Sequence, residues 1–335
     1  MVTERSMTGR SKKIGITTTV PLEPFLAADV IPVDLNNVFV SGSGANEKVE
    51  EAQVRGFPRN ICTWIKGIYT ASREVDGVVG VVRGDCSNTE SLLSTLEREG
   101  KSVHPFSYPF VRERELLEEE ISNLCSYLGT TIEKSGEMAP EVRRLRDMAL
   151  ELDEIAWKEG GIHARDVHLA LVSTSDMNSD PDGWERDVRA LIDGPRDPSL
   201  STGGPRLGFI GVPPIISDLF PKLEGLGASV VFFEVQRQFA MPERTGDWVR
   251  DYLEYTYPYD IGRRVKDIRE QSEKRRVDGI IHYVQSFCHR QIDDIIFRKE
   301  LGLPVLTLEG NLPGPLDERS LIRLEAFLDV LEGGP

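Results

Sequence analysis

Short runs of apolar and β-branched residues alternate along the chain with longer segments whose apolar residues recur at three- and four-residue steps. This alternation is typical of parallel β-strands joined by crossover helices. It predicts strands at residues 14–19, 30–35 and 78–82, and, in the second half, at residues 207–210, 229–233, 279–284 and 304–308. Both halves are therefore expected to contain βαβ units, which makes the fold class α/β.

A helical region separates the two halves. Residues 111–192 carry apolar positions at helical spacing and few strand signals. The following residues 193–205 are rich in Gly, Pro and Ser, as expected of a linker. We therefore expect an N-terminal α/β domain with a helical extension over residues 1–200 and a C-terminal α/β domain over residues 201–335. A final amphipathic helix is predicted at residues 316–332.

Composition excludes several classes of protein. The 335 residues suffice for about two domains, each with a core of its own. A formal net charge of −15 argues against nucleic acid as a partner, because binding to phosphates requires clustered Lys and Arg. The polar start and the lack of long apolar runs predict neither a secretory signal nor a membrane span. Four cysteines are too few for a disulfide framework, so a cytoplasmic location is expected.

The four cysteines differ in their surroundings. They contain no C-x-x-C pair, which argues against zinc ribbons and thioredoxin-like redox motifs. Cys86 and Cys288 each follow a predicted strand and precede a predicted helix, and Cys62 lies in the first turn of another helix. Cys125 lies in the middle of a helix at an apolar position, which favours a place in the core.

Three of these cysteines are expected to converge. In open α/β sheets the ligand crevice lies beyond the carboxyl ends of the strands, where Cys86 and Cys288 are predicted. The helix N-termini next to Cys62, Cys86 and Cys288 would favour the thiolate form of each. Three thiolates at one crevice would make a metal or iron-sulfur site. Cysteines after strands are also common as small buried apolar residues, so the spacing alone leaves both interpretations open.

Several segments in the same order resemble the D-component family of 2-hydroxyacyl-CoA dehydratases, which includes benzoyl-CoA reductase subunits. Residues 14–23 (IGITTTVPLE) and 28–33 (ADVIPV) are similar to the family's opening strands. Residues 60–63 (NICT) and 76–86 (DGVVGVVRGDC) resemble its first two cysteine motifs. Residues 278–332 resemble its C-terminal block, which contains the third cysteine.

The resemblance implies two flavodoxin-like (Rossmann-like) parallel-sheet domains with a helical connecting region. It also implies one 4Fe-4S cluster per chain, held between the domains by Cys62, Cys86 and Cys288, with one iron that has no cysteine ligand. In this family an ATP-dependent iron-sulfur activator protein delivers a low-potential electron. The electron converts an acyl-CoA thioester to a ketyl radical, from which a hydroxyl group leaves. A homodimer, or a heterodimer with a related subunit, is expected.

Three further residues are candidates for catalysis. Thr18 occupies the turn after the first strand, where family members often carry Ser or Cys. His289 follows a predicted ligand, and Glu309 ends a predicted strand that leads to the crevice. A phosphate loop is not expected, because position 95 before Gly100-Lys101-Ser102 is Thr instead of Gly.

The sequence leaves two alternatives to a dehydratase-type lyase subunit. One is a non-catalytic electron-transfer protein on the same scaffold, which the short chain and the absence of Ser in the first turn would fit. The other is a structural relative that binds zinc or no metal. The residues do not identify the acyl group or a binding site for CoA.

Overall fold

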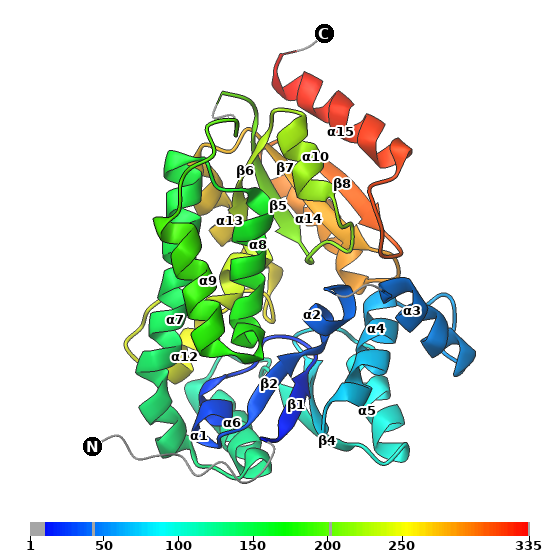
Figure 1. Ribbon diagram of the computed structural model, residues 1–335, viewed down its shortest axis with the longest axis vertical. Coiled ribbons are helices and arrows are strands. Elements are labelled where there is room, and N and C mark those ends of the chain that lie inside the picture. The colour runs from blue at the N-terminus through cyan, green and yellow to red at the C-terminus, as the bar shows by residue number, and fades with distance from the viewer. Residues whose placement is uncertain (1–10, 42–43, 201–202, 334–335) are drawn as a thin grey trace.

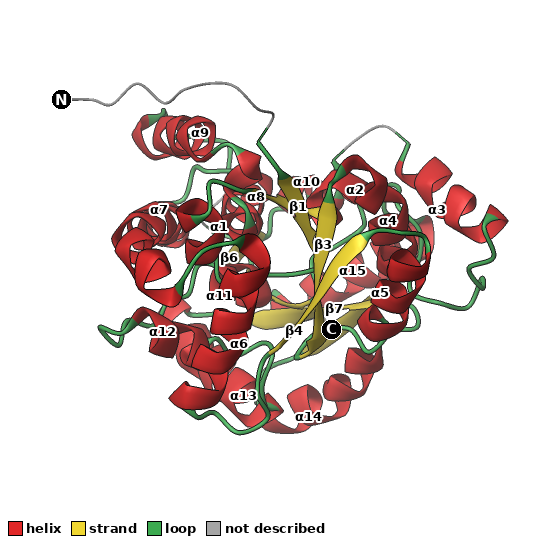
Figure 2. Cartoon of the chain, turned by 90° about the horizontal axis from the view of Figure 1, so that it is seen from below, coloured by secondary structure: helices red, strands yellow, loops and turns green. Residues whose placement is uncertain are grey.

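The computed structural model describes residues 11–41, 44–200 and 203–333. It contains two four-stranded, all-parallel sheets, one above the other in Figure 1, with helices around them (Figure 2). The strands of the first sheet are β1 (Lys13–Ile16), β2 (Ile31–Asp34), β3 (Gly77–Arg83) and β4 (Ser102–Ser107). Those of the second are β5 (Arg206–Gly211), β6 (Ser229–Phe233), β7 (Gly279–Gln285) and β8 (Val305–Gly310). The predicted α/β class is confirmed.

The two sheets share one topology. Their strand orders are β2-β1-β3-β4 and β6-β5-β7-β8, so each repeats the flavodoxin-like arrangement in which the winding reverses beside the first strand. The reversal leaves a gap between crossovers at the carboxyl ends of β1 and β3 in one sheet, and of β5 and β7 in the other. Ligands of such sheets bind at these points.

Helices of the first half surround the first sheet and lead into the connecting region. The first-half helices are α1 (Glu23–Ala27), α2 (Leu35–Val40), α3 (Ala45–Val54), α4 (Thr63–Ala71) and α5 (Thr89–Arg98). The connecting helices are α6 (Arg114–Leu128), α7 (Ile132–Glu159), α8 (Ala164–Val172) and α9 (Pro181–Asp193). The helical region predicted at residues 111–192 is thus confirmed. Three single 3-10 turns lie at Ser72–Glu74, Ser173–Ser175 and Met177–Ser179.

Helices of the second half complete the fold. They are α10 (Leu219–Gly225), α11 (Glu234–Phe239), α12 (Trp248–Glu254), α13 (Ile261–Arg275), α14 (Asp293–Glu300) and α15 (Glu318–Leu331), with the 3-10 turn η4 (His289–Ile292) before α14. The predicted final helix corresponds to α15, which begins where the side chain of Asp317 accepts a hydrogen bond from the backbone N–H of Ser320. Within the described residues, no helix is long and apolar enough to cross a membrane.

Two details of the first sheet differ from the sequence prediction. Strand β4 was not predicted, because it is an edge strand that contains Pro105 and buries only Phe106 completely. Strand β1 ends at Ile16 instead of residue 19. The chain leaves the sheet there, and the hydroxyl of Thr17 accepts the hydrogen bond of the Val81 amide. The Thr17 side chain thus takes the place of a backbone acceptor next to β3.

Packing joins the two halves across the predicted boundary. Val235 and Phe239 of α11 belong to the same hydrophobic cluster as Ile14 and Ile16 of the first sheet. Helix α8 packs against α11 and β6, and Figure 1 shows α7, α8 and α9 beside both sheets. The division into domains at residue 200 stays a prediction; residues 1–10 of the first and residues 201 and 202 of the second lie outside the described residues.

Candidate functional site

A cavity of about 130 Å³ lies between the two sheets, beyond the carboxyl ends of β1, β3 and β7. Its wall contains Cys62, Cys86 and Cys288, and also Thr18 and His289. Thr18 is buried, whereas His289 is exposed. The structure therefore brings five of the six predicted site residues to one place.

Glu309 is not among the residues that line this cavity. It is exposed on β8, and its carboxylate accepts a hydrogen bond from the Ser286 hydroxyl at 2.7 Å. Strand β8 is the edge strand next to β7, so its carboxyl end lies one strand away from the β5–β7 pair where the winding of the sheet reverses. The hydrogen bond with Ser286 connects Glu309 to the turn before Cys288. Its predicted catalytic role stays untested.

Each cavity cysteine sits where a chain turn directs backbone N–H groups at its sulfur. Cys62 is the residue before α4, with extended backbone angles, and the amides of Trp64 and Ile65 face its sulfur. Cys86 follows a turn at Gly84, whose φ is +100°, and the Nδ2 of Asn88 lies 3.6 Å from its Sγ. The result is a set of donors suited to sulfur anions at three separate turns.

Burial and backbone N–H groups shift the pKa values of these thiols in opposite directions. Burial raises the pKa of Cys62 to about 11 and that of Cys86 to about 12, and burial also raises the pKa of Cys288. The backbone N–H groups lower each pKa, as expected, but burial outweighs them. The predicted effect of the N–H groups is therefore present in direction, and burial opposes it.

The donor set fits a multinuclear centre better than a single ion. Among the described residues, no three His, Cys, Asp or Glu side chains lie close enough together to hold one metal ion. The cysteines are nevertheless neighbours, because the charge of Cys288 raises the pKa of Cys62 and the charge of Cys62 raises the pKa of Cys86. An iron-sulfur cube binds each thiolate at a different iron. Separated thiols around one cavity are compatible with this group, and their role as ligands stays a prediction.

Cys125 lies elsewhere. It is buried in α6 within the cluster that contains Leu124, and its Sγ is 3.3 Å from the Ser135 hydroxyl of α7. The cavity wall does not include it. The structure agrees with the interpretation of Cys125 as a core residue.

Arg290 ties two of the cysteine turns together. Its guanidinium donates hydrogen bonds to the carbonyl of Gly84 at 3.2 Å and to the carbonyl of Tyr257 at 2.8 Å. It also stacks 4.1 Å from the centroid of the Tyr257 ring, whose hydroxyl donates to Asp85 at 3.2 Å. The turn that precedes Cys86 is thereby joined to the residues that follow Cys288. No motif in the sequence indicated this contact, because its partners are mainly backbone carbonyls.

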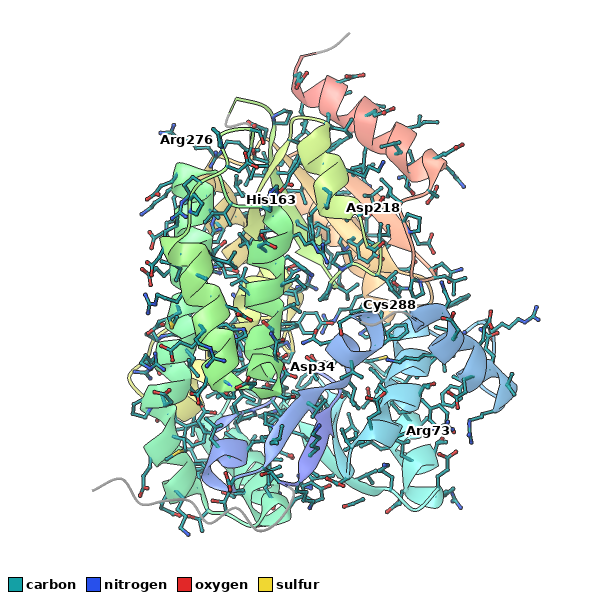
Figure 3. The ribbon with its side chains drawn as sticks, viewed as in Figure 1. Asp34, Arg73, His163, Asp218, Arg276 and Cys288 are labelled. Carbon is teal, nitrogen blue, oxygen red and sulfur yellow. The ribbon has the colours of Figure 1, made fainter. Side chains whose placement is uncertain are left out.

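A buried acidic pair forms another part of the site that sequence reasoning missed. Asp34 ends β2 and lines the cavity; its carboxylate accepts a hydrogen bond from the Ser175 hydroxyl at 2.6 Å. Its backbone N–H donates to the carboxylate of Asp176 at 2.7 Å. Burial raises the pKa of both carboxyls. The position of Asp34 at a strand end could have indicated it, whereas Asp176 has no signal in the sequence. Figure 3 labels Asp34 and Cys288, which lie in the central region between the sheets.

His168 of α8 is a further wall residue. It is buried, with ring centroids 4.9 Å from Phe220 and 6.2 Å from Phe233. Its Nδ1 has no hydrogen-bond partner among the described residues. Burial lowers the pKa of His168 to about 3, so its imidazole is neutral near pH 7.

The lowered pKa of His168 predicts that acid decreases the folding stability of the native chain, and that replacement of His168 removes this part of the decrease. Below its ordinary pKa of 6.5, His168 takes up a proton in the unfolded chain but not in the folded chain, so folding stability falls as the pH decreases. The loss is about 1.4 kcal/mol per pH unit. Between pH 7.5 and about pH 5 the native chain should lose about 2 kcal/mol more unfolding free energy than His168→Phe, measured by urea denaturation. An equal loss in both proteins would contradict the prediction.

Comparison with known proteins adds one match. The sequence model of the family described as 2-hydroxyglutaryl-CoA dehydratase, D-component, matches residues 17–331. The match begins directly after β1 and includes Thr18, the three cavity cysteines and every described strand except β1. No curated protein matches the chain.

Proposed function

Since the chain belongs to the 2-hydroxyglutaryl-CoA dehydratase D-component family, we propose that it is the iron-sulfur subunit of a 2-hydroxyacyl-CoA dehydratase-type enzyme. The observation that carries this proposal is the meeting of Cys62, Cys86 and Cys288, from three separate turns, at one cavity between the sheets. The fourth cysteine, Cys125, lies in the hydrophobic core instead. The three cavity cysteines are the residues that would hold a 4Fe-4S cluster.

Such a cluster would supply one-electron reduction and a Lewis-acidic iron without a cysteine ligand. The protein buries most of the surface around the three sulfurs and directs backbone N–H donors at each of them. Arg290 also joins the turns that carry Cys86 and Cys288 by its hydrogen bond to Gly84. Hydrogen bonds to sulfur and exclusion of solvent are two of the means by which proteins set cluster potentials. Burial and the N–H donors would therefore be the means by which this chain sets the potential of the cluster.

The proton chemistry of a dehydration would fall to residues of the same cavity. Loss of a hydroxyl group together with a neighbouring proton needs a group that can accept and return a proton. The carboxyl of Asp34 is suited to this, because its raised pKa brings its protonation nearer to neutrality. Thr18 could orient a substrate oxygen through its hydroxyl, and His289 could exchange protons with solvent at the mouth.

The proposed partners are an ATP-dependent iron-sulfur activator protein and a second subunit, either another copy of this chain or a related chain. The activator follows from the family and from the lack of a complete phosphate-loop motif in this sequence. The chain would therefore receive its electron from outside.

Anaerobic reconstitution with iron and sulfide tests the proposal. The expected product is a brown protein with about four iron and about four sulfide per chain and an EPR signal after reduction. Addition of the activator, ATP and a 2-hydroxyacyl-CoA should then yield the enoyl-CoA product, detected by chromatography. A chain that remains colourless, or binds zinc without sulfide, would overturn the proposal. A loaded chain that is reduced by the activator but turns over no thioester, with the second subunit also present, would support the electron-transfer alternative.

A further inference from the structure

The cavity wall away from the cysteines is apolar. The loop after β5 contributes Val212, Pro213 and Pro214, and α11 contributes Val235 and Phe239. Helix α8, which packs against α11, contributes Leu169 and Val172. A ligand group that enters this part of the cavity exchanges water for aliphatic and aromatic surface. That exchange favours an apolar group.

The same wall offers no positive charge. Among the described residues that line the cavity there is no Lys or Arg, while two carboxyl groups, Asp34 and Asp85, face it. His168 is held neutral by burial near pH 7. The guanidinium of Arg290 lies near Asp85 but already donates hydrogen bonds to the carbonyls of Gly84 and Tyr257. A carboxylate placed here would therefore meet no lysine or arginine of the wall and would be repelled by the two acidic residues. Burying an unpaired ion is among the most unfavourable events in a protein site.

Three buried nitrogens in the wall have no hydrogen-bond partner among the described residues. They are the Nδ2 of Asn37, the Nε1 of Trp64 and the Nδ1 of His168. The indole nitrogen is a donor only, and the neutral imidazole can donate or accept at Nδ1. Buried donors without partners are unfavourable unless a ligand satisfies them. A neutral oxygen of the substrate, in the thioester carbonyl or the hydroxyl group, would satisfy Trp64.

We propose that the cavity selects a 2-hydroxyacyl thioester whose acyl side chain is uncharged and apolar, and that it excludes the second carboxylate of a 2-hydroxyglutaryl group. The inference rests on the proposed function, because it assigns the acyl group to the cavity beside the three cysteines. Selection arises from the apolar wall and the absence of a cation. The three buried nitrogens then recognise the oxygens that all such thioesters share.

Equilibrium binding of two thioesters tests this specificity without turnover. Isothermal titration calorimetry of the metal-free and reconstituted chains would compare 2-hydroxy-4-methylpentanoyl-CoA with 2-hydroxyglutaryl-CoA, and CoA alone would give the contribution of the shared nucleotide. The branched thioester should bind at least about tenfold more tightly, since one unpaired buried polar group costs about 1–3 kcal/mol. Equal or tighter binding of 2-hydroxyglutaryl-CoA would overturn the inference and leave the proposed function standing. If neither thioester binds better than CoA, the proposed function itself is wrong.

A lysine introduced into the wall provides a second test. Leu169 lines the cavity and its side chain is 46% exposed, so Leu169→Lys can extend to solvent without disturbing the core. The variant should bind 2-hydroxyglutaryl-CoA about tenfold more tightly than the native chain, because the ammonium can pair with the second carboxylate. Leu116→Lys is the matched control, since Leu116 is 39% exposed on α6 and lies outside the cavity wall. An equal response of the two variants would overturn the assignment of the acyl group to this cavity.

Discussion

Replacement of Cys288 with serine is expected to abolish loading of the iron-sulfur centre, whereas Cys125→Ser should load as the native chain does. Cys288 lines the cavity together with Cys62 and Cys86. Its replacement therefore removes one of the three thiols that could bind iron. A serine hydroxyl has a much higher pKa than a thiol and is a poor ligand for iron. The same loss is expected for Cys62→Ser and Cys86→Ser. Iron and sulfide analysis after anaerobic reconstitution, together with absorbance near 400 nm, measures the effect.

Cys125→Ser is a matched control because it makes the same chemical change at a buried thiol. Cys125 is 1% exposed and contacts the Ser135 hydroxyl, so the substitution keeps a polar partner. It should cost some stability through burial of a hydroxyl group but should leave the iron and sulfide content unchanged. Circular dichroism separates misfolding from loss of ligation in each variant. Normal iron and sulfide content in all three cavity variants would contradict the ligand assignment.

Arg264→Met is expected to lower the unfolding free energy by about 3–5 kcal/mol, the largest stability effect that we predict for a single substitution. Arg264 is 1% exposed. Its guanidinium donates to both carboxylate oxygens of Glu234, at 2.6 and 2.9 Å, and to Asp293 at 2.7 Å. Glu234 is completely buried, and it also accepts the Gly211 amide at 2.9 Å. Methionine fills similar volume but leaves a buried carboxylate without its cation.

The adjacent Arg263 supplies the control. Arg263 forms an ion pair with Glu254, and the two side chains are 42% and 37% exposed, respectively. Because exposed ion pairs contribute little, Arg263→Met should change the unfolding free energy by only about 0–1 kcal/mol. Urea denaturation of native, Arg263→Met and Arg264→Met chains measures both effects. A second variant, Arg264→Met with Glu234→Gln, should recover part of the loss because the unpaired charge is removed. Equal destabilisation by both arginine substitutions would show that the buried cation has no special role.

The Arg264 network also explains why the site depends on elements far apart in the sequence. Glu234 begins α11, one of whose residues, Val235, lines the cavity. Asp293 begins α14 directly after the turn that carries Cys288. Arg264 of α13 therefore joins the apolar wall of the cavity to one cysteine turn. Loss of this cation should loosen both.

Local patterns predicted the parts of this protein that local physics governs. The β-branched runs that became β3, β5, β6 and β7 are buried, and their composition alone distinguishes them from the surrounding helices. The same reasoning missed β4, because an edge strand with Pro105 and one fully buried side chain has no hydrophobic pattern. Positions of Cys86 and Cys288 at strand ends follow from the strands themselves. Their arrival at a common cavity was inferred from the rule for open sheets, and the structure agrees with that inference.

By itself, the sequence determined the α/β class, the parallel sheets and the separation of Cys125 from the other three cysteines, because these depend on side-chain periodicity within short segments. Only the tertiary structure decided the protonation and polarity of the site. The thiol pKa values rise because the surrounding elements together bury the cavity, which outweighs the local N–H groups. The Asp34–Asp176 pair joins residues 142 positions apart. The absence of a cation from the apolar wall likewise depends on which helices meet there, and no single segment encodes it.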